Sequence, residues 1–252
     1  GLPNYDEMPR PDLVGITAFT SQANRAYEVA ASFRAQDVPV IMGGIHASVR
    51  LDEAMQRADS VVTGEAEDVW PQVLEDARNK RLKRRYDGGM SDIAEFKPAR
   101  HDLLPGEYAF GAIQTTRGCP LNCSFCSVTA FNGTRYRQRS IPDVVSEFKS
   151  IPENRVLVVD DNLIGTRVEH IARAKELFRA MVQANMKKEW IAQTTINFAD
   201  DDELLALAYQ AGCRGVFIGF ESPTPEGLSE IGKKYNLKDA RDLGDSVRRI
   251  QK

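Results

Sequence analysis

Three of the four cysteines in this chain lie in one short stretch, where their thiols could share a metal. The stretch TTRGCPLNCSFCS, residues 115–127, carries Cys119, Cys123 and Cys126, with three residues in the first gap and two in the second. Thiols this close can bind a metal, form a disulfide or do neither. A small set of cysteines, most of them in one cluster, does not make a disulfide framework. The pattern indicates a metal or redox site in a reducing compartment.

The number of available ligands separates the kinds of metal site. A structural zinc ion takes four protein ligands, but Cys213 is far along the chain and no histidine lies between residues 102 and 169. Three thiolates on a [4Fe–4S] cluster leave one iron without a protein ligand, and a substrate or cofactor can bind there. The residues favour an iron–sulfur cluster, with a zinc site or merely packed thiols as the alternatives.

Composition excludes some classes of protein. The chain has 252 residues, enough to bury a full core, and a net charge of −3 that gives no reason to expect nucleic acid as a partner. No apolar run approaches the roughly 20 residues that a transmembrane segment needs, and the first residues have neither a basic leader nor an apolar signal core. We expect a soluble, cytoplasmic protein.

Alternating apolar and amphipathic segments predict an α/β fold with mainly parallel sheets. In the first third, strands are expected within 13–19, 38–44 and 59–65, which would form a doubly wound unit with ligand-binding strand ends. The stretch 79–106, with its basic run 80–85, is expected to be a solvated linker.

From about residue 107 four βα units follow, with strands expected within 108–116, 155–162, 190–197 and 214–222. Ser140 is expected to cap one helix, and residues 167–184 to form another. Four strands cannot close a barrel, so a partial TIM-like (β/α) barrel is predicted, with its chemistry on the loops after the strands. Cys213 is expected to be buried, and His101 and His170 to lie at the surface.

The cysteine loop resembles the signature of the radical S-adenosylmethionine (SAM) superfamily. The spacing CxxxCxxC, the aromatic residue before Cys126, the flanking TTRGC and the position after the first barrel strand carry this resemblance. It implies that Cys119, Cys123 and Cys126 ligate a [4Fe–4S] cluster whose open iron chelates SAM. Reduction of the cluster would then cleave SAM and generate a 5′-deoxyadenosyl radical.

The resemblance also implies SAM contacts at the ends of the barrel strands. Many relatives have Gly-Gly-Glu after the second strand, whereas this sequence has Asp160, Asp161 and Asn162, which could equally shape a turn. Further candidates lie on the third and fourth strands, namely Gln193, Asn197, Gly219 and Glu221, with a supporting hydrogen bond as the alternative role for each. The arginines after the loop could contact a carboxylate, shield the cluster or form a solvated basic face: Arg135, Arg137 and Arg139.

The first third is similar to the cobalamin-binding domain that precedes the barrel in one large radical SAM subgroup. This similarity implies corrin contacts from strand ends, with Thr17, Ala18, Gly43, Gly44 and Thr63 as candidates, while glycines that only serve turns are the alternative. His46 is a candidate cobalt ligand or a cavity-lining or capping residue, because it follows a later strand and lacks an Asp-x-His-x-x-Gly loop. The expected organisation is an incomplete flavodoxin-like domain at 1–88 without its first strand, a linker at 89–108 and a barrel at 109–252 without its C-terminal part.

The leading hypothesis is a cobalamin-dependent radical SAM methyltransferase that methylates an unactivated carbon. A cobalamin-linked cyclase or oxidative enzyme, or a cobalamin-free radical SAM enzyme, is the first alternative. A zinc-binding module without enzymatic activity is the second. The expected partners are a small-molecule or lipid-like substrate and an electron donor such as flavodoxin or ferredoxin, and no catalytic side chain is assigned.

Overall fold

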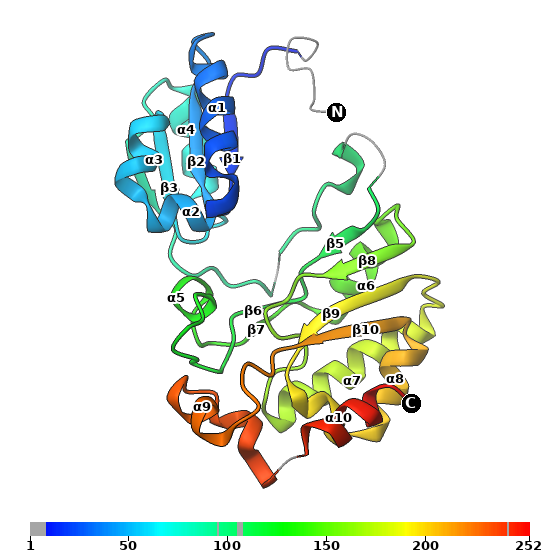
Figure 1. The fold of residues 1–252 in the computed structure, drawn as a ribbon. Helices are drawn as coiled ribbons and strands as arrows, with labels where there is room; N and C mark the ends of the chain where they lie inside the picture. The colour runs from blue at the N-terminus through cyan, green and yellow to red at the C-terminus, as the bar shows by residue number, and fades with distance from the viewer. Residues whose placement is uncertain (1–8, 95, 105–107, 241) are drawn as a thin grey trace. The chain divides into compact units, whose positions relative to one another are not determined.

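The structure is a computed structural model that describes residues 9–94, 96–104, 108–240 and 242–252. The chain forms two compact units, Gly1–Ser91 and Asp92–Lys252. The division falls within the stretch 89–108 that the sequence predicts as the linker. Each unit is built on its own parallel sheet, so each is considered by itself (Figure 1).

The first unit contains a four-stranded parallel sheet in the order β1-β2-β3-β4. Its strands are β1 (Val14–Thr17), β2 (Val40–Gly43), β3 (Ser60–Thr63) and β4 (Arg85–Asp87). Between them lie η2 (Thr20–Gln22), α1 (Ala23–Arg34), α2 (Gly44–Val49), α3 (Leu51–Arg57) and α4 (Trp70–Arg78). Because side chains alternate along a strand, Val40 and Met42 pack with α1 and α3, whereas Ile41 packs with α4.

The described strands follow one another in the sheet, with α1 and α3 on one face and α4 on the other, as expected for a Rossmann-like unit. One expectation for this unit was wrong. The stretch 79–106, expected to be linker throughout, contains β4 and so contributes a strand to the sheet. The charged side chains of the basic run 80–85 are exposed as expected, and the Arg84 guanidinium also donates to the carbonyls of Ala58 and Asp59 at 3.0 and 2.8 Å. A three-residue strand is too short to produce a periodic signal.

The second unit contains a four-stranded parallel sheet in the order β10-β9-β8-β5. Its strands are β5 (Gly111–Ile113), β8 (Arg155–Val158), β9 (Glu189–Thr194) and β10 (Cys213–Ile218). The helices that follow these strands are α6 (Ile141–Ser150), α7 (Val168–Gln183) and α8 (Asp202–Gln210), which lie along one side of the sheet (Figure 1). The unbroken order of parallel strands is that of a partial barrel.

The remaining elements of this unit are short. A two-stranded antiparallel ribbon joins β6 (Thr116–Arg117) to β7 (Arg137–Gln138), and the cysteine loop and α5 (Val128–Asn132) lie between its strands. After β10 come α9 (Pro225–Glu230), η5 (Lys234–Ala240) and α10 (Leu243–Ile250), while η3 (His101–Leu103) and η4 (Ile196–Asp200) are short 3-10 helices. Ser140 caps α6 as predicted, since its side chain accepts from the amide of Asp143 at 3.3 Å.

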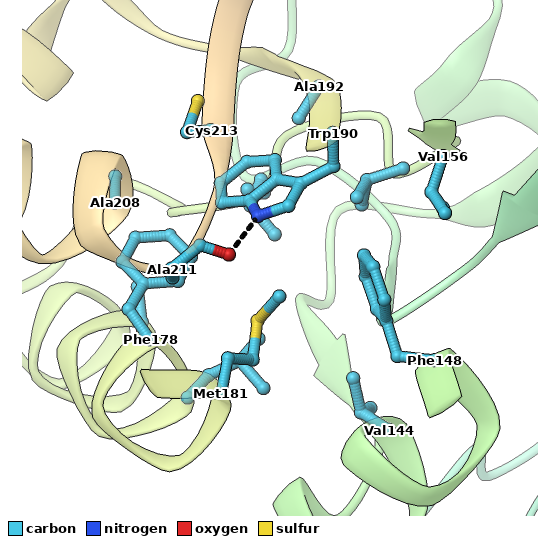
Figure 2. Close-up of a cluster of buried hydrophobic side chains, with 14 of the residues drawn as sticks. Val144, Phe148, Val156, Phe178, Met181, Trp190, Ala192, Ala208, Ala211 and Cys213 are labelled. Atoms are coloured by element: carbon cyan, nitrogen blue, oxygen red, sulfur yellow. Dashed lines mark hydrogen bonds between the residues drawn. The ribbon is translucent and has the colours of Figure 1, made fainter. Parts of the chain in front are cut away.

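The core of the second unit is packed around Trp190, whose indole lies between α7 and β10 (Figure 2). The indole Nε1 donates to the Ala211 carbonyl at 2.9 Å, and the ring centroid lies 5.4 Å from that of Phe178. A buried indole N–H needs such a partner. Cys213 belongs to this core, which confirms its predicted burial.

Candidate functional site

The cysteine loop leaves the β6–β7 ribbon at Gly118. This residue has a φ of +88°, and a Cβ built on it would lie 2.3 Å from the carbonyl oxygen of Arg135. Only glycine combines that dihedral with so close a backbone approach. The amide of Cys119 donates to the carbonyl of Gly133 at 3.3 Å, and the amide of Cys126 to that of Cys123 at 3.1 Å. The ribbon therefore fixes the start of the loop, and the loop folds back on itself between its last two cysteines.

The three thiols of the loop are free and lie close enough to influence one another. Burial raises the pKa of Cys119, with smaller effects in the same direction from Asp161 and from the other two thiols. Burial also raises the pKa of Cys123, and the ammonium of Lys233 opposes that shift. A bound cation would reverse these shifts, because metal ligation requires the thiolate form.

This donor set fits the expected cluster. Among the described residues, no three His, Cys, Asp or Glu side chains are grouped to hold one metal ion. In a cubane each thiolate binds a different iron, so its ligands need not converge on a single point as they do around zinc. Three unpaired thiols on one loop supply the ligands that such a cluster takes from protein.

Asp160, at the end of β8, binds the backbone that leads into the loop. Its carboxylate accepts from the amide and the hydroxyl of Thr115, at 2.6 Å each, and from the amide of Thr116 at 3.0 Å. The side chain is fully buried, and this burial raises its pKa despite the three donors. Both oxygens of Asp160 are therefore engaged within the protein. Asp161 is partly exposed, and its carboxylate accepts from Asn132 at 2.9 Å.

Asn162 and Asn197 form a buried polar cluster with Thr195, beyond the ends of β8 and β9. The Thr195 hydroxyl lies 3.4 Å from Asn162 Oδ1 and also donates to Asn197 Oδ1, while Asn197 Nδ2 donates to the carbonyl of Gly165 at 3.2 Å. Asn162 Nδ2 is buried without a hydrogen-bond partner in the described part of the chain. A buried unsatisfied donor is unfavourable, so this amide is suited to a ligand. Gln193, the predicted contact on β9, has an exposed side chain.

Glu221 and Gly219 lie just after β10 and share a third partner, Lys233. The Lys233 ammonium is 2.7 Å from Glu221 Oε1. A Cβ on Gly219 would lie 2.3 Å from that carboxylate oxygen and 2.6 Å from the ammonium. A side chain at position 219 would therefore collide with the ion pair between Glu221 and Lys233, which explains why this residue is a glycine.

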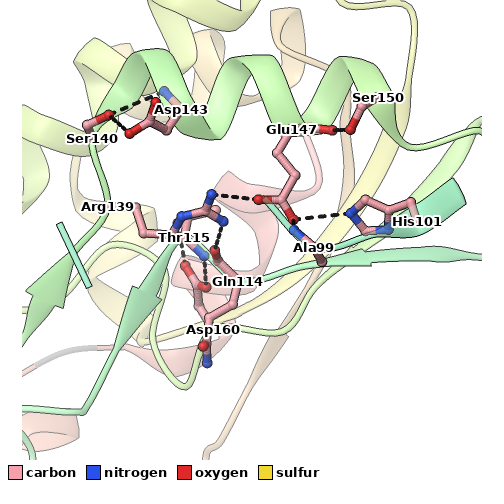
Figure 3. Close-up of polar contacts among 10 residues, drawn as sticks. All are labelled: Ala99, His101, Gln114, Thr115, Arg139, Ser140, Asp143, Glu147, Ser150 and Asp160. Atoms are coloured by element: carbon pink, nitrogen blue, oxygen red, sulfur yellow. Dashed lines mark hydrogen bonds and ion pairs between the residues drawn. The ribbon is translucent and has the colours of Figure 1, made fainter. Parts of the chain in front are cut away.

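Two of the three arginines after the loop are buried, which contradicts a solvated basic face for them. Arg137 donates to the Asn132 carbonyl at 2.9 Å, and Arg139 donates to the Gln114 carbonyl at 2.9 Å (Figure 3). Arg139 also pairs with Glu147 of α6 at 2.6 Å. These two residues hold the ribbon, whereas Arg135 is exposed.

His101 was wrongly expected at the surface. It is buried, and its Nε2 lies 3.1 Å from Glu147 Oε1, which also accepts from the amide of Ala99 at 3.2 Å (Figure 3). The segment before β5 is thereby attached to α6. His170 is partly buried, and its ring centroid lies 4.3 Å from that of Tyr136.

In the first unit, three of the predicted corrin contacts meet at the ends of β1 and β2. Gly44 has a φ of +81°, and a Cβ on it would lie 2.3 Å from Thr17 Oγ1. The glycine thus lets the start of α2 approach the exposed end of β1, and Gly43 ends β2 directly before it. Ala18 is buried, and its carbonyl accepts from the amide of His46 at 3.2 Å. Thr63, at the end of β3, donates to Asp87 at 2.7 Å.

The imidazole of His46 is buried and has partners on both nitrogens. Its Nε2 lies 2.7 Å from the Tyr27 hydroxyl, and its Nδ1 lies 3.2 Å from Thr20 Oγ1. Glu53 Oε1 is 4.0 Å from Nε2. The ring therefore ties α1 and the loop after β1 to α2, and it caps neither end of α2.

Sequence reasoning missed Thr115, Tyr136 and Lys233. Thr115 lies next to the cysteine motif, but its partner Asp160 is remote in sequence. Tyr136 donates to the Leu163 carbonyl at 2.6 Å, and burial raises its pKa. Lys233 lies in a polar segment and has no sequence signal of its own, because its burial depends on the loop that packs against it.

The geometry defines a class of protein: an α/β domain with strand-end glycines joined to a partial barrel whose first loop carries three free thiols. The sequence model of the Radical SAM superfamily matches residues 113–251, and that of the B12 binding domain matches residues 6–74. The chain belongs to the radical SAM superfamily and has a B12-binding domain in front of the radical SAM fold.

Individual relatives agree with this assignment. The bacteriochlorophyllide d C-8(2)-methyltransferase of Chlorobaculum tepidum is 31% identical over 94% of this chain and 57% of its own length. The bacteriochlorophyllide d C-12(1)-methyltransferase from the same organism is 30% identical over 89% of this chain and 51% of its own length. The structure of TsrM from Kitasatospora setae with cobalamin and a [4Fe–4S] cluster bound shares the fold, with a TM-score of 0.71, 21% identity, and coverage of 98% of this chain and 56% of that one. The chain thus spans about half the length of these proteins.

The family matches support the expected cofactors, a [4Fe–4S] cluster, SAM and cobalamin. They also exclude the zinc-binding module as the class of this chain. In the described residues, no helix has the length and apolar character needed to cross a membrane.

Proposed function

We propose that this chain is part of a cobalamin-dependent radical SAM methyltransferase that methylates an unactivated carbon of a small-molecule or lipid-like substrate. One observation carries the proposal: a loop of three free thiols follows the first strand of a radical SAM fold, in a chain that also contains a B12-binding domain. Relatives that align with most of this chain include C-methyltransferases of bacteriochlorophyllide. A cytoplasmic location with flavodoxin or ferredoxin as the electron donor belongs to the same proposal, because the cysteines and the cluster require reducing conditions.

The residues divide into ligands and groups that orient the cofactors. Cys119, Cys123 and Cys126 would hold the cluster. Asp161 and the unpartnered amide of Asn162 are suited to bind SAM, as acceptor and donor, because both lie at the strand end that follows the cysteine loop in the barrel. Gln193, Asn197, Gly219 and Glu221 remain candidates from the neighbouring strand ends.

Asp160 acts differently from its neighbours, because its oxygens are already bound by Thr115 and Thr116. It orients the strand that carries the loop. In the first unit, Thr17, Gly43 and Gly44 would contact the corrin, with Thr63 at the end of the next strand. When bound, these cofactors supply reductive cleavage of SAM and carriage of a methyl group, while the protein binds, orients and excludes water.

The test uses the complete protein, prepared without oxygen and reconstituted with iron, sulfide and hydroxocobalamin. With titanium(III) citrate and methyl-labelled SAM, we expect 5′-deoxyadenosine and recovery of label with the corrinoid. Deoxyadenosine without any transfer of label would instead support a cyclase, an oxidative enzyme or a cobalamin-free radical SAM enzyme.

The matched control is the triple variant Cys119→Ala, Cys123→Ala, Cys126→Ala, which should bind neither iron nor sulfide but still bind cobalamin. A Cys213→Ala variant should keep the cluster, because that thiol is part of the hydrophobic core. Iron retained by the triple variant at the wild-type level would overturn the ligand assignment.

A further inference from the structure

Lys233 is a buried cation beside the cysteine loop. Lys233 is 8% exposed, and its ammonium lies 5.9 Å from the ring centroid of Phe125. Phe125 belongs to the cysteine loop, where it lies between Cys123 and Cys126 in the sequence. The ammonium is therefore held against the loop that carries the predicted cluster ligands, and it is also paired with Glu221 at 2.7 Å.

The backbone around Lys233 is bound to the same loop. Both the amide and the hydroxyl of Ser124 donate to the carbonyl of Ile231, at 3.1 Å each. A Cβ on Gly232 would lie 3.6 Å from the carbonyl oxygen of Asn122. The segment after α9 thus follows the cysteine loop closely, which places the backbone of Lys233 beside that loop.

The end of β10 fixes the ammonium from the other side. Glu221 has a φ of +65°, an uncommon conformation for a residue with a side chain, and from it the carboxylate reaches Lys233 at 2.7 Å. Asn236 is buried, and its amide donates to the carbonyls of Gly219 and Phe220 at 3.2 and 3.4 Å. Local strain of this kind persists only where the surrounding contacts impose it.

We propose that Lys233 is a positioning and charge-tuning residue: its ammonium, held by Glu221 against the cysteine loop, raises the reduction potential of the bound cluster. The inference rests on cluster binding by this loop. One-electron reduction adds a negative charge to the centre, and a fixed positive charge in a partly buried site stabilises the reduced state. The electron comes from the external donor, and no bond is formed or broken at the lysine.

The test measures the midpoint potential of the reconstituted cluster in the complete protein, by electron paramagnetic resonance during a dithionite-based redox titration. For Lys233→Met we expect about a tenfold smaller equilibrium constant for reduction, which is about 59 mV toward more negative potential for one electron. Lys233→Arg should stay close to wild type. The matched control is Lys234→Met, which removes the same charge at an exposed neighbouring position.

The outcomes separate this inference from the proposed function. A wild-type protein that assembles no cluster overturns both. Equal potentials in wild type and Lys233→Met, or equal shifts in Lys233→Met and Lys234→Met, overturn the role of Lys233 alone. If Lys233→Met does not fold, Gly219→Ala replaces it, since the added methyl group pushes the ion pair apart without removing a charge; an unchanged potential in that variant also overturns the inference.

Discussion

Asp160 binds Thr115 through both carboxylate oxygens, one to the amide and one to the hydroxyl, each at 2.6 Å. This pair joins the end of β8 to the backbone that enters the cysteine loop. The loop therefore depends on a residue from the next strand of the barrel, and not only on its own sequence.

Replacing Asp160 by Asn should impair cluster binding, because an amide cannot accept at both positions. We expect the apoprotein to lose about 1–3 kcal/mol of stability, the range for a buried group left unsatisfied. The iron bound per chain after reconstitution should fall below half of the wild-type value. Thr115→Val is the graded control, since it removes only the hydroxyl bond and should retain more iron. Full iron binding by Asp160→Asn would contradict the positioning role.

Asp160 should also affect the pH dependence of stability. Burial raises its folded-state pKa above the unfolded value, so the folded state holds the proton more tightly. The contribution to the free energy of unfolding is therefore fully present below about pH 4, the ordinary Asp pKa, and is lost as the pH rises through the folded-state pKa. Urea unfolding of the apoprotein from pH 4 upward should show this decline in the wild type and lack it in Asp160→Asn. Parallel curves for the two proteins would contradict it.

His46 should not ligate cobalt, because Tyr27 and Thr20 already contact both ring nitrogens. We expect His46→Gln to destabilise the first unit by about 1–3 kcal/mol. The electron paramagnetic resonance spectrum of bound cob(II)alamin should not change. The control is wild-type protein with ¹⁵N-labelled histidine; an isotope-dependent splitting that is lost in His46→Gln would show that the imidazole leaves its partners to bind the metal.

The Cys213 thiol should be unreactive in the folded protein. Burial raises its pKa to about 11, so only about one molecule in a thousand carries the thiolate at pH 8, and the thiolate is the reactive form. Iodoacetamide treatment of the apoprotein at pH 8 should alkylate Cys126, which is partly exposed, and should modify Cys213 only after unfolding. Mass spectrometry of the two peptides makes the comparison, and equal labelling of both cysteines before unfolding is the contrary result.

The parts of this molecule that were predictable from the sequence are those with local signals. The helix cap at Ser140 and the buried strand that contains Trp190 both follow from residues within a few positions of one another. The cysteine motif is equally local, and its spacing indicated the cofactor before any contact was known.

The parts that were not predictable depend on partners far apart in sequence. His101 is buried because Glu147, 46 residues away, accepts from it, and nothing near His101 indicates such a partner. The same holds for Lys233, whose environment is formed by Phe125 and Glu221. Charged residues are expected at the surface unless a partner is known, and pairing at this distance is a property of the fold.

Gly118 offers the sharpest test of how the backbone prepares the cluster site. Alanine there would bring a methyl group within 2.3 Å of the Arg135 carbonyl oxygen and 3.0 Å of that of Asn132, at a φ of +88°. Gly89→Ala is the matched control: its φ is +70°, but nothing lies within 4 Å of the added carbon. Both variants incur the strain of a positive φ, roughly 1–2 kcal/mol. Only Gly118→Ala must also shift the backbone at residue 118, which leads directly into Cys119. We therefore expect Gly118→Ala to lose most of its iron and Gly89→Ala to keep it, and similar iron contents in the two variants would show that the ribbon does not set the position of the first ligand.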